Sequence, residues 1–534
     1  MTTYQRTAEA PARRRASRGG KRGERRASAP VAAPRAAGAL ARRLWWAGLG
    51  GVLAVAVLLR LPGLDGPIGG FHAFNEAHYI LMAQNVLQGW ILDPTSDQTA
   101  VFLDKPPLLA YLLALPFAVG GPSILVARLV ALLISVLLVG AVGLLGRELY
   151  DAETGLAAGA MMATAPIAVI AGRNVQTDAL YLLLTVAALW CYYRADYARP
   201  VANRLLAGAL FGLAIFAKLF AALAVVAAAV WDLLVHGARP LRDRWRWLAA
   251  LLVVLPSGLF YAYHALRDYR YFVSDVFGGA AVATTVPTTA AAWGVLVSEA
   301  WWACAPSLAV LILAGVIVAL ARPRPPTLYL LLPLLLYAAF YVYAHKHSYY
   351  MLFLLPFGTI LAAAALGRLP WRAARVAIVV AACGYAAFVT LVDYPAMKLG
   401  FQEWAEASAR LNGGEGLRII LDPDVAVNAG PVARLYLGRA ELVENGRAAG
   451  PPPPGGVYRL SYAVPGPTAP ADAQLFSMER HGLLAFGWLI ADDHVVGPHF
   501  FHQGRYFVER VGGLLDFGFP VIRPYPILRL TPVR

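Results

Sequence analysis

The sequence has few charged residues and very few cysteines. Only 14% of its 534 residues are Asp, Glu, Lys or Arg, while 59% are hydrophobic, a balance that excludes an ordinary soluble domain. The three cysteines, Cys191, Cys304 and Cys383, lie within apolar blocks, so they offer neither a disulfide framework nor a zinc motif. The apolar residues come in long runs, which predicts a protein that crosses a membrane many times.

The positive charge is concentrated in an N-terminal head and in short loops. The formal net charge is +15, and residues 1–43 contain the arginine-rich run "PARRRASRGGKRGERRASAP". This head is too long and too basic for a signal peptide, and its composition predicts disorder. Beside a membrane span, a basic head more commonly contacts anionic lipid at the cytoplasmic face than nucleic acid, so we expect no nucleic acid partner.

Eleven apolar segments are predicted to span the membrane. They cover residues 44–61, 123–145, 154–172, 177–194, 204–217, 219–236, 246–264, 300–320, 327–344, 349–367 and 376–392. Because Lys and Arg mark cytoplasmic loops, the N-terminus is predicted to be inside and everything after Tyr394 outside. The segment "PPLLAYLLALPFAVGG" is too short to span comfortably, so we expect an interfacial or re-entrant helix there.

The composition changes near residue 394. No later block is long enough to span, and "RIILDPDVAV" and "GVYRLSYAV" are typical of strands. We therefore predict a disordered cytoplasmic head (1–43), an all-α domain of about 11–13 transmembrane helices (44–393) and an extracytoplasmic α/β domain (394–534). The expected location is the plasma membrane.

A polar stretch, "FHAFNEAHY", follows the first predicted span. Asn75 is a good N-cap, and the apolar residues after it share one helical face, which predicts an amphipathic helix on the outer membrane surface. Glu76 then lies in the first turn, where a helix dipole favours a carboxylate. This position would place an anionic group beside the membrane opening, and a capped helix with a solvated Glu is the alternative. His72 and Glu76 are four residues apart, a spacing that could share a divalent metal, although two ligands alone are a weak signal.

Further polar residues are predicted at the same outer face. Lys105 precedes two prolines, where it could hold a phosphate oxygen or simply extend to the interface. "RNVQTDAL" places Arg173, Gln176 and Asp178 at a span end, and "FAKLF" places Lys218 at a tight turn. "HKHSYY" adds the cationic residues His345, Lys346 and His347 beside Tyr349. Aromatic residues at such a place are usually an interfacial belt.

Taken together, these groups suit a lipid-linked phosphate. Carboxylates and cations from distant parts of the chain are predicted to meet above an apolar domain that could hold a lipid tail. A carboxylate there could deprotonate an acceptor hydroxyl, and the cations could stabilise the charge on a leaving phosphate.

The ordered set of motifs resembles a known family, the GT-C glycosyltransferases of the protein O-mannosyltransferase and aminoarabinose-transferase type. "NEAHY" stands where that family commonly has Asp-Glu-Ala-Arg-Tyr, and "DKPPL" where it has Glu-Lys-Pro-Pro-Leu. "RNVQTDAL", "GLAIFAKLF" and "HSYYMLFLLP" resemble its later motifs in the same order. The resemblance covers roughly residues 44–393. It implies an inverting transfer of a hexose or pentose from a polyprenyl-phosphate donor to a protein, lipid or glycan.

The same resemblance implies roles for individual residues. Glu76, Asp178 and Asn75 fall at catalytic positions, and the donor phosphate would be bound by Lys105, His78, His345, Lys346, His347 and Tyr349, with Arg173 and Lys218 as further contacts. Asn75 replaces the family's Asp and His78 replaces its Arg. Because Asn cannot accept a proton, either Glu76 or Asp178 is the base, or the protein belongs to a divergent branch of the family, or it is inactive. A non-catalytic polyprenyl-phosphate binder on the same fold and a transporter are the alternatives.

Overall fold

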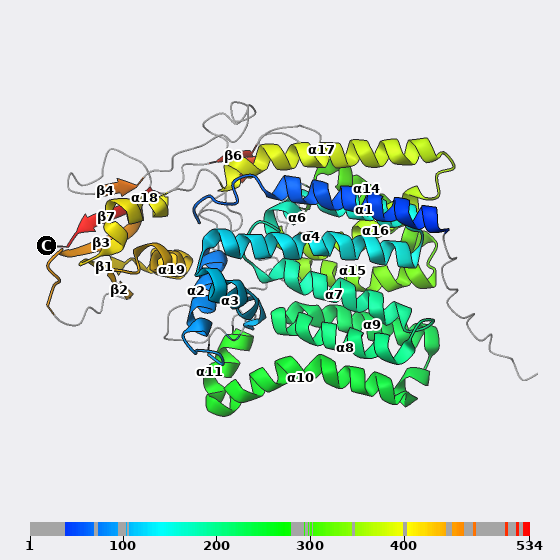
Figure 1. Ribbon diagram of the computed structural model, residues 1–534, viewed down its shortest axis with the longest axis horizontal. Coiled ribbons are helices and arrows are strands. Elements are labelled where there is room, and N and C mark those ends of the chain that lie inside the picture. Colours follow the sequence, from blue (N-terminus) through cyan, green and yellow to red (C-terminus); the bar gives the residue numbers. More distant parts are fainter. Residues whose placement is uncertain are drawn as a thin grey trace, which may run out of the picture.

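The structure is a computed structural model that describes most of the chain from residue 38 to residue 533. The described residues are 38–68, 73–93, 103, 106–278, 293, 297, 300–301, 303–343, 348–398, 403–444, 451–463, 474–476, 508–510, 520–522 and 527–533. A bundle of helices is followed by a smaller domain at one end of the bundle (Figure 1).

The bundle consists of the helices between residues 39 and 398. The elements are α1 (Ala39–Arg60), α2 (Ala73–Leu87), α3 (Leu108–Gly120), α4 (Ile124–Leu149), α5 (Ala152–Thr164), α6 (Pro166–Ala171), α7 (Thr177–Arg194), α8 (Pro200–Ala217), η1 (Leu219–Ala221), α9 (Ala222–His236), η2 (Arg239–Arg242), α10 (Arg244–Arg267), α11 (Tyr269–Val273), η3 (Ser274–Gly278), α14 (Pro306–Ala321), α15 (Pro325–Tyr343), η4 (Ser348–Phe353), α16 (Leu355–Leu366) and α17 (Arg372–Lys398). Seven of the described helices are long and apolar enough to cross a bilayer: α1, α4, α8, α9 with η1, α10, α15 and α17.

Most predicted spans coincide with helices, but two are interrupted. The predicted span 154–172 is broken into α5 and α6, because Pro166 has no N–H with which to continue the helix. The predicted span 349–367 starts as the 3₁₀ segment η4 before α16. The segment expected to be interfacial forms α3, whose 13 residues give a length of about 20 Å, less than a hydrocarbon core.

Small residues let α4 and α5 approach closely. A Cβ atom on Gly155 would lie 2.4 Å from the carbonyl oxygen of Gly143 and 2.9 Å from Cβ of Arg147. Because both obstacles belong to α4 and are not flexible chain ends, no side chain fits at this position without moving a helix. Such small-residue contacts are typical of helix pairs in membranes.

The C-terminal domain is built on a mixed five-stranded sheet in the order β2-β1-β3-β7-β4. Its strands are β1 (Arg418–Leu421), β2 (Glu441–Glu444), β3 (Val457–Ala463), β4 (Gln474–Phe476) and β7 (Ile527–Pro532), and a second pair joins β5 (Val508–Arg510) to β6 (Pro520–Ile522). Helix α18 (Glu403–Arg410), η5 (Asn412–Gly414) and α19 (Pro423–Leu437) accompany the first sheet. The α/β class predicted from the sequence is confirmed, although only "RIIL" of "RIILDPDVAV" is strand and the rest begins α19.

The two parts are joined through α2. Helix α19 packs on α2, and the backbone N–H of Ile68 donates to the Tyr436 hydroxyl at 2.7 Å. In Figure 1, α2, α3 and the C-terminal domain lie at the same end of the bundle, and the turn between α9 and α10 lies at the other. Helix α17 continues to Lys398, slightly beyond the predicted domain boundary at residue 394.

We predict that Gly155→Ala destabilises the bundle. The added methyl group forces α4 and α5 apart and should lower the free energy of unfolding by about 1–3 kcal/mol. Gly50→Ala is the matched control, because a Cβ atom there meets nothing within 4 Å. Thermal unfolding of the detergent-purified variants measures both effects. Equal unfolding temperatures for the two variants would contradict this account of the α4–α5 contact.

Candidate active site

Glu76 lies in a buried ion pair with Arg128. The Arg128 Nε donates to Glu76 Oε1 at 2.7 Å, and its Nη2 donates to Oε2 at 3.0 Å. Both side chains are buried, with exposed fractions of 2% for Arg128 and 0% for Glu76. The backbone N–H of Val175 also donates to Oε1, at 3.4 Å. Glu76 therefore joins α2, α4 and the segment before α7.

Arg128 also organises the loop between α1 and α2. Its guanidinium donates to the carbonyl oxygens of Leu64 (2.9 Å), Gly66 and Pro67 (3.2 Å). The Arg128 guanidinium thus donates to one carboxylate and three backbone carbonyls at once. An arginine can do this because its planar group has five N–H donors, whereas a lysine has three on a single nitrogen. Residues 64–67 of this loop are therefore held by the same residue that neutralises Glu76.

The position of α2 differs from the sequence prediction in two ways. It begins at Ala73, so Asn75 lies in its first turn and is not the N-cap. Five successive residues, Glu76 to Ile80, are buried, because α2 packs between α3 and α19. The alternative of a solvated Glu76 was therefore wrong, because α2 is packed between the bundle and the C-terminal domain. The place of α2 at the outer membrane surface stays a prediction.

A second ion pair joins Asp178 and Lys218. The Lys218 Nζ lies 2.7 Å from Asp178 Oδ1, and Asp178 is 3% exposed at its side chain. Lys218 lies between α8 and η1, where its backbone is extended, with φ −162° and ψ 126°. Among the described residues, no hydrogen bond to Oδ2 of Asp178 is present. One carboxylate oxygen is thus left for another partner.

Aromatic rings surround the Lys218 ammonium. Its nitrogen lies 5.2 Å from the ring centre of Phe220, 5.4 Å from Phe353, 5.6 Å from Tyr350 and 6.0 Å from Tyr181. These distances permit cation–π attraction. The rings come from α7, η1 and η4, so Lys218 connects segments that are distant in sequence.

The two ion pairs are neighbours. The backbone N–H of Val175 donates to Glu76, and Asp178 follows three residues later. Even a fully extended chain would place the Cα atoms of Val175 and Asp178 no more than about 11 Å apart. Arg173 is also buried here, with 2% exposure. His78 is fully buried on α2, and its ring stacks on Phe74 with centres 5.9 Å apart.

Several predicted residues lie outside the described part of the chain. These are His72, Lys105, His345, Lys346 and His347, together with the side chain of Tyr349. Leu103, two residues before Lys105, is described: its N–H donates to Asp275 Oδ2 at 2.6 Å, and its carbonyl accepts from the Tyr261 hydroxyl at 3.1 Å. Within the described ranges, no group of three or more His, Cys, Asp or Glu side chains could hold a metal. The metal-binding expectation for His72 and Glu76 stays a prediction.

Sequence reasoning missed Arg128 and Arg60. Arg60 is fully buried and donates to Ser135 Oγ at 2.9 Å and to the carbonyl oxygens of Ala56, Ala163 and Ala168. Ala163 and Ala168 flank the break between α5 and α6, where carbonyl groups need donors from outside the helix. A lone arginine within or at the end of an apolar span was the signal, since such residues are costly unless they have partners.

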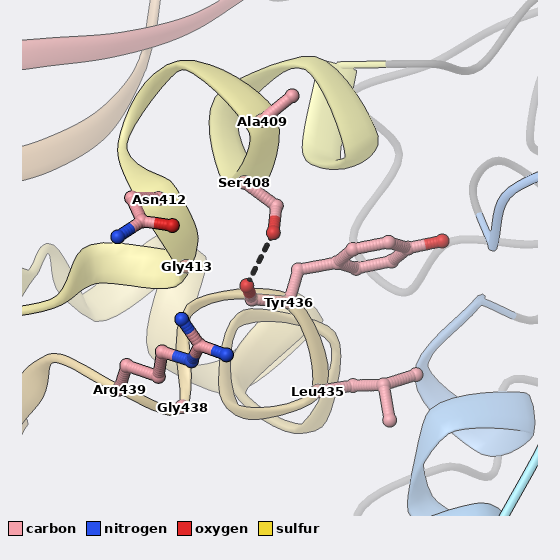
Figure 2. A pocket seen from close by; sticks show the side chains of 8 residues that line it. All are labelled: Ser408, Ala409, Asn412, Gly413, Leu435, Tyr436, Gly438 and Arg439. Atoms are coloured by element: carbon pink, nitrogen blue, oxygen red, sulfur yellow. Dashed lines mark hydrogen bonds between the residues drawn. The ribbon is translucent and has the colours of Figure 1, made fainter.

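An open pocket of about 390 Å³ lies in the C-terminal domain, apart from the two ion pairs. Its lining comes from α18, η5 and the end of α19: Ser408, Ala409, Asn412, Gly413, Leu435, Tyr436, Gly438 and Arg439. Ser408 donates to the Tyr436 carbonyl, while the Tyr436 ring points away from that bond (Figure 2). The phenol hydroxyl instead contacts Ile68, so Tyr436 serves the junction with the bundle.

We predict that replacing one partner of the buried Glu76–Arg128 pair lowers the free energy of unfolding more than replacing both partners does. Glu76→Leu or Arg128→Met leaves an uncompensated buried charge, which should cost about 3–5 kcal/mol of unfolding free energy. The double variant should lose less than the sum of the two single losses. Thermal unfolding of the purified variants measures this coupling.

The control for this cycle is an exposed pair at the other end of the bundle. Glu153 is 49% exposed and lies 2.7 Å from Arg372 Nε and 2.9 Å from Arg375 Nη2, so Glu153→Leu should change stability by about 1 kcal/mol or less. Strictly additive losses for Glu76→Leu and Arg128→Met would contradict the direct coupling.

Comparisons with known proteins agree with this architecture. The family model of dolichyl-phosphate-mannose-protein mannosyltransferases matches residues 104–260, which is less than half of the chain. This match includes Asp178 and Lys218 and begins after Glu76. No curated protein matches the sequence.

Two solved structures are similar. ArnT from Cupriavidus metallidurans bound to undecaprenyl phosphate has a TM-score of 0.55 and 16% identity, over 77% of this chain and 87% of ArnT. The archaeal oligosaccharyltransferase AglB from Archaeoglobus fulgidus, in complex with an inhibitory peptide and a dolichol-phosphate, has a TM-score of 0.51 and 13% identity, over 77% of this chain and 65% of AglB. Both have the GT-C fold, so the resemblance seen in the motifs is confirmed at the level of the fold.

Proposed function

We propose that this protein, which has the GT-C fold, transfers a sugar from a polyprenyl-phosphate donor to a hydroxyl acceptor. The observation that carries the proposal is the meeting of Glu76 with Arg128 and Asp178 with Lys218 at one end of the bundle. The family-model match and the lipid phosphates bound by ArnT and AglB support the donor class. The sugar, whether hexose or pentose, and the protein, lipid or glycan acceptor are for experiment to identify.

The two acids have different roles in this proposal. Both oxygens of Glu76 accept bonds from Arg128, so Glu76 is a positioning residue that fixes α2 against the start of α7. Asp178 shares only Oδ1 with Lys218 and is the proposed general base. Asn75, in the first turn of α2, can orient a substrate hydroxyl but cannot take its proton.

In the proposed reaction, Asp178 accepts the proton of the acceptor hydroxyl. The hydroxyl oxygen forms a bond to the anomeric carbon while the bond from that carbon to the phosphate oxygen breaks. The phosphate leaves with the electron pair and stays on the polyprenyl carrier. A single displacement of this kind inverts the anomeric configuration. Lys105, His78, Arg173, Lys218 and the segment His345 to Tyr349 supply the proposed groups that stabilise the phosphate.

The proposed site faces the extracytoplasmic side of the plasma membrane. The two ion pairs lie at the end of the bundle that carries the C-terminal domain, and the Arg-rich loop between α9 and α10 lies at the opposite end (Figure 1). Lys and Arg excess marks the cytoplasmic side, which supports this orientation.

A donor screen tests the proposed activity. Membranes that contain the protein are incubated with labelled polyprenyl-phosphate hexoses and pentoses, and the label is followed into lipid, glycan and protein fractions. We expect one donor class to lose its label to one fraction. Binding of the polyprenyl phosphates without transfer of any sugar would instead select the non-catalytic carrier-binding alternative.

We predict that Asp178→Asn lowers kcat by about 10²-fold or more, because a positioned general base contributes that much. Donor binding should change little, since the amide keeps the shape of the side chain, whereas the unfolding temperature should fall because Lys218 loses its ion-pair partner. The rate is therefore measured per folded protein. Glu153→Gln at the far end of the bundle is the control and should leave the rate unchanged. Wild-type kcat in Asp178→Asn would exclude Asp178 as the base.

A further inference from the structure

Gln176 has a buried amide group with no partner in the described part of the chain. The residue is 3% exposed, and neither its nitrogen nor its oxygen has a hydrogen-bond partner there. Its backbone is extended, with φ −150° and ψ 157°, and its side chain does not cap α7. A glutamine amide carries two donors and an acceptor oxygen, so all of this capacity is unused.

Buried polar groups of this kind require an explanation. Native proteins pair the large majority of such groups with a hydrogen-bond partner, and the exceptions commonly mark a functional group or a position at which water or a ligand binds. Thr185, Ser257 and Tyr337 on the bundle helices also have a buried side-chain oxygen with no hydrogen-bond partner among the described residues, but each of them has only that one polar atom in its side chain. Gln176 differs from these three because it has two separate polar atoms, a donor nitrogen and an acceptor oxygen, and neither has a partner within the described ranges.

The place of Gln176 in the chain identifies the kind of partner. It follows Val175, whose N–H contacts Glu76, and precedes Asp178, which contacts Lys218. The amide therefore belongs to the short segment that connects the two ion pairs. A ligand that reacts at Asp178 would therefore lie close to the side chain of Gln176, which is two residues away in the chain.

The chemistry of the amide distinguishes between parts of a lipid-linked sugar. A phosphate offers only acceptors and is better bound by cations, and a hydrocarbon tail offers neither donor nor acceptor. A sugar hydroxyl both donates and accepts, so one or two adjacent hydroxyls can satisfy both ends of a glutamine.

We propose that Gln176 binds hydroxyl groups of the transferred sugar and thereby selects the donor. This inference rests on the proposed function and deepens it, because it assigns the recognition of the sugar to a residue distinct from the proposed base. A site built to bond a hydroxyl rejects analogues that lack it, since its own polar groups are then left unpaired.

The test compares deoxygenated donors in wild-type protein and in two variants. Short-chain polyprenyl-phosphate hexoses and pentoses, each with its monodeoxy analogues, are assayed for kcat/KM and for the thermal stabilisation that they produce on binding. In wild-type protein, loss of the contacted hydroxyl should lower kcat/KM about 10- to 100-fold. In Gln176→Met, the same deoxygenation should cost about nothing further, because the amide is already gone.

A second variant and a control make the test specific. Gln176→Glu keeps the shape and the acceptor oxygens but loses the donors, so it should retain selectivity only for a hydroxyl that donates. Thr185→Val removes another buried, unpartnered group of α7 and should leave the ranking of donors as in wild-type protein.

The outcomes separate the two proposals. Equal losses on deoxygenation in wild-type protein and Gln176→Met would overturn the role of Gln176 even if sugar transfer is observed. Donor binding without transfer would contradict the proposed catalysis, while the stabilisation measurements would still decide on Gln176. A protein that none of the donors stabilises would overturn the role of Gln176 as well.

Discussion

The buried pair of Glu76 and Arg128 is the constraint on which the end of the bundle depends. In an apolar interior neither charge is tolerated alone, so each requires the other at close range. Arg128 also bonds three carbonyl groups of the loop before α2, and Glu76 accepts an N–H from the segment before α7. One ion pair thereby positions a loop, two helices and the start of a third.

The second pair, Asp178 with Lys218, is built differently. Lys218 is surrounded by aromatic rings and holds only one oxygen of Asp178, which leaves the carboxylate able to interact further. The Glu76–Arg128 pair, in which both carboxylate oxygens are bonded, makes this region rigid. The Asp178–Lys218 pair leaves one carboxylate oxygen available within the described part of the chain. A reaction site needs both features, because the reacting group must be held in position and still be able to bond the substrate. Gln176 lies in the segment between them.

The sequence predicted helices well where one segment is long and apolar. Helix α7 begins and ends at the predicted residues 177 and 194, and α9 with η1 covers the predicted 219–236. It failed where packing decides the outcome. Asn75 was expected to cap a surface helix, but α2 begins at Ala73, and its residues from Glu76 to Ile80 are buried where it packs against α3 and α19. Pro166, in contrast, was a local signal for the break between α5 and α6 that could have been used.

The sequence by itself determined that the chain is a polytopic membrane protein with an α/β domain after it, because hydrophobic runs and charge are properties of each segment alone. The ordered motifs also indicated the GT-C fold. Only the tertiary structure decided which charges meet. Arg128 is 52 positions from Glu76, and Lys218 is 40 from Asp178. No local pattern encodes such pairings, since they arise from helix packing across the bundle.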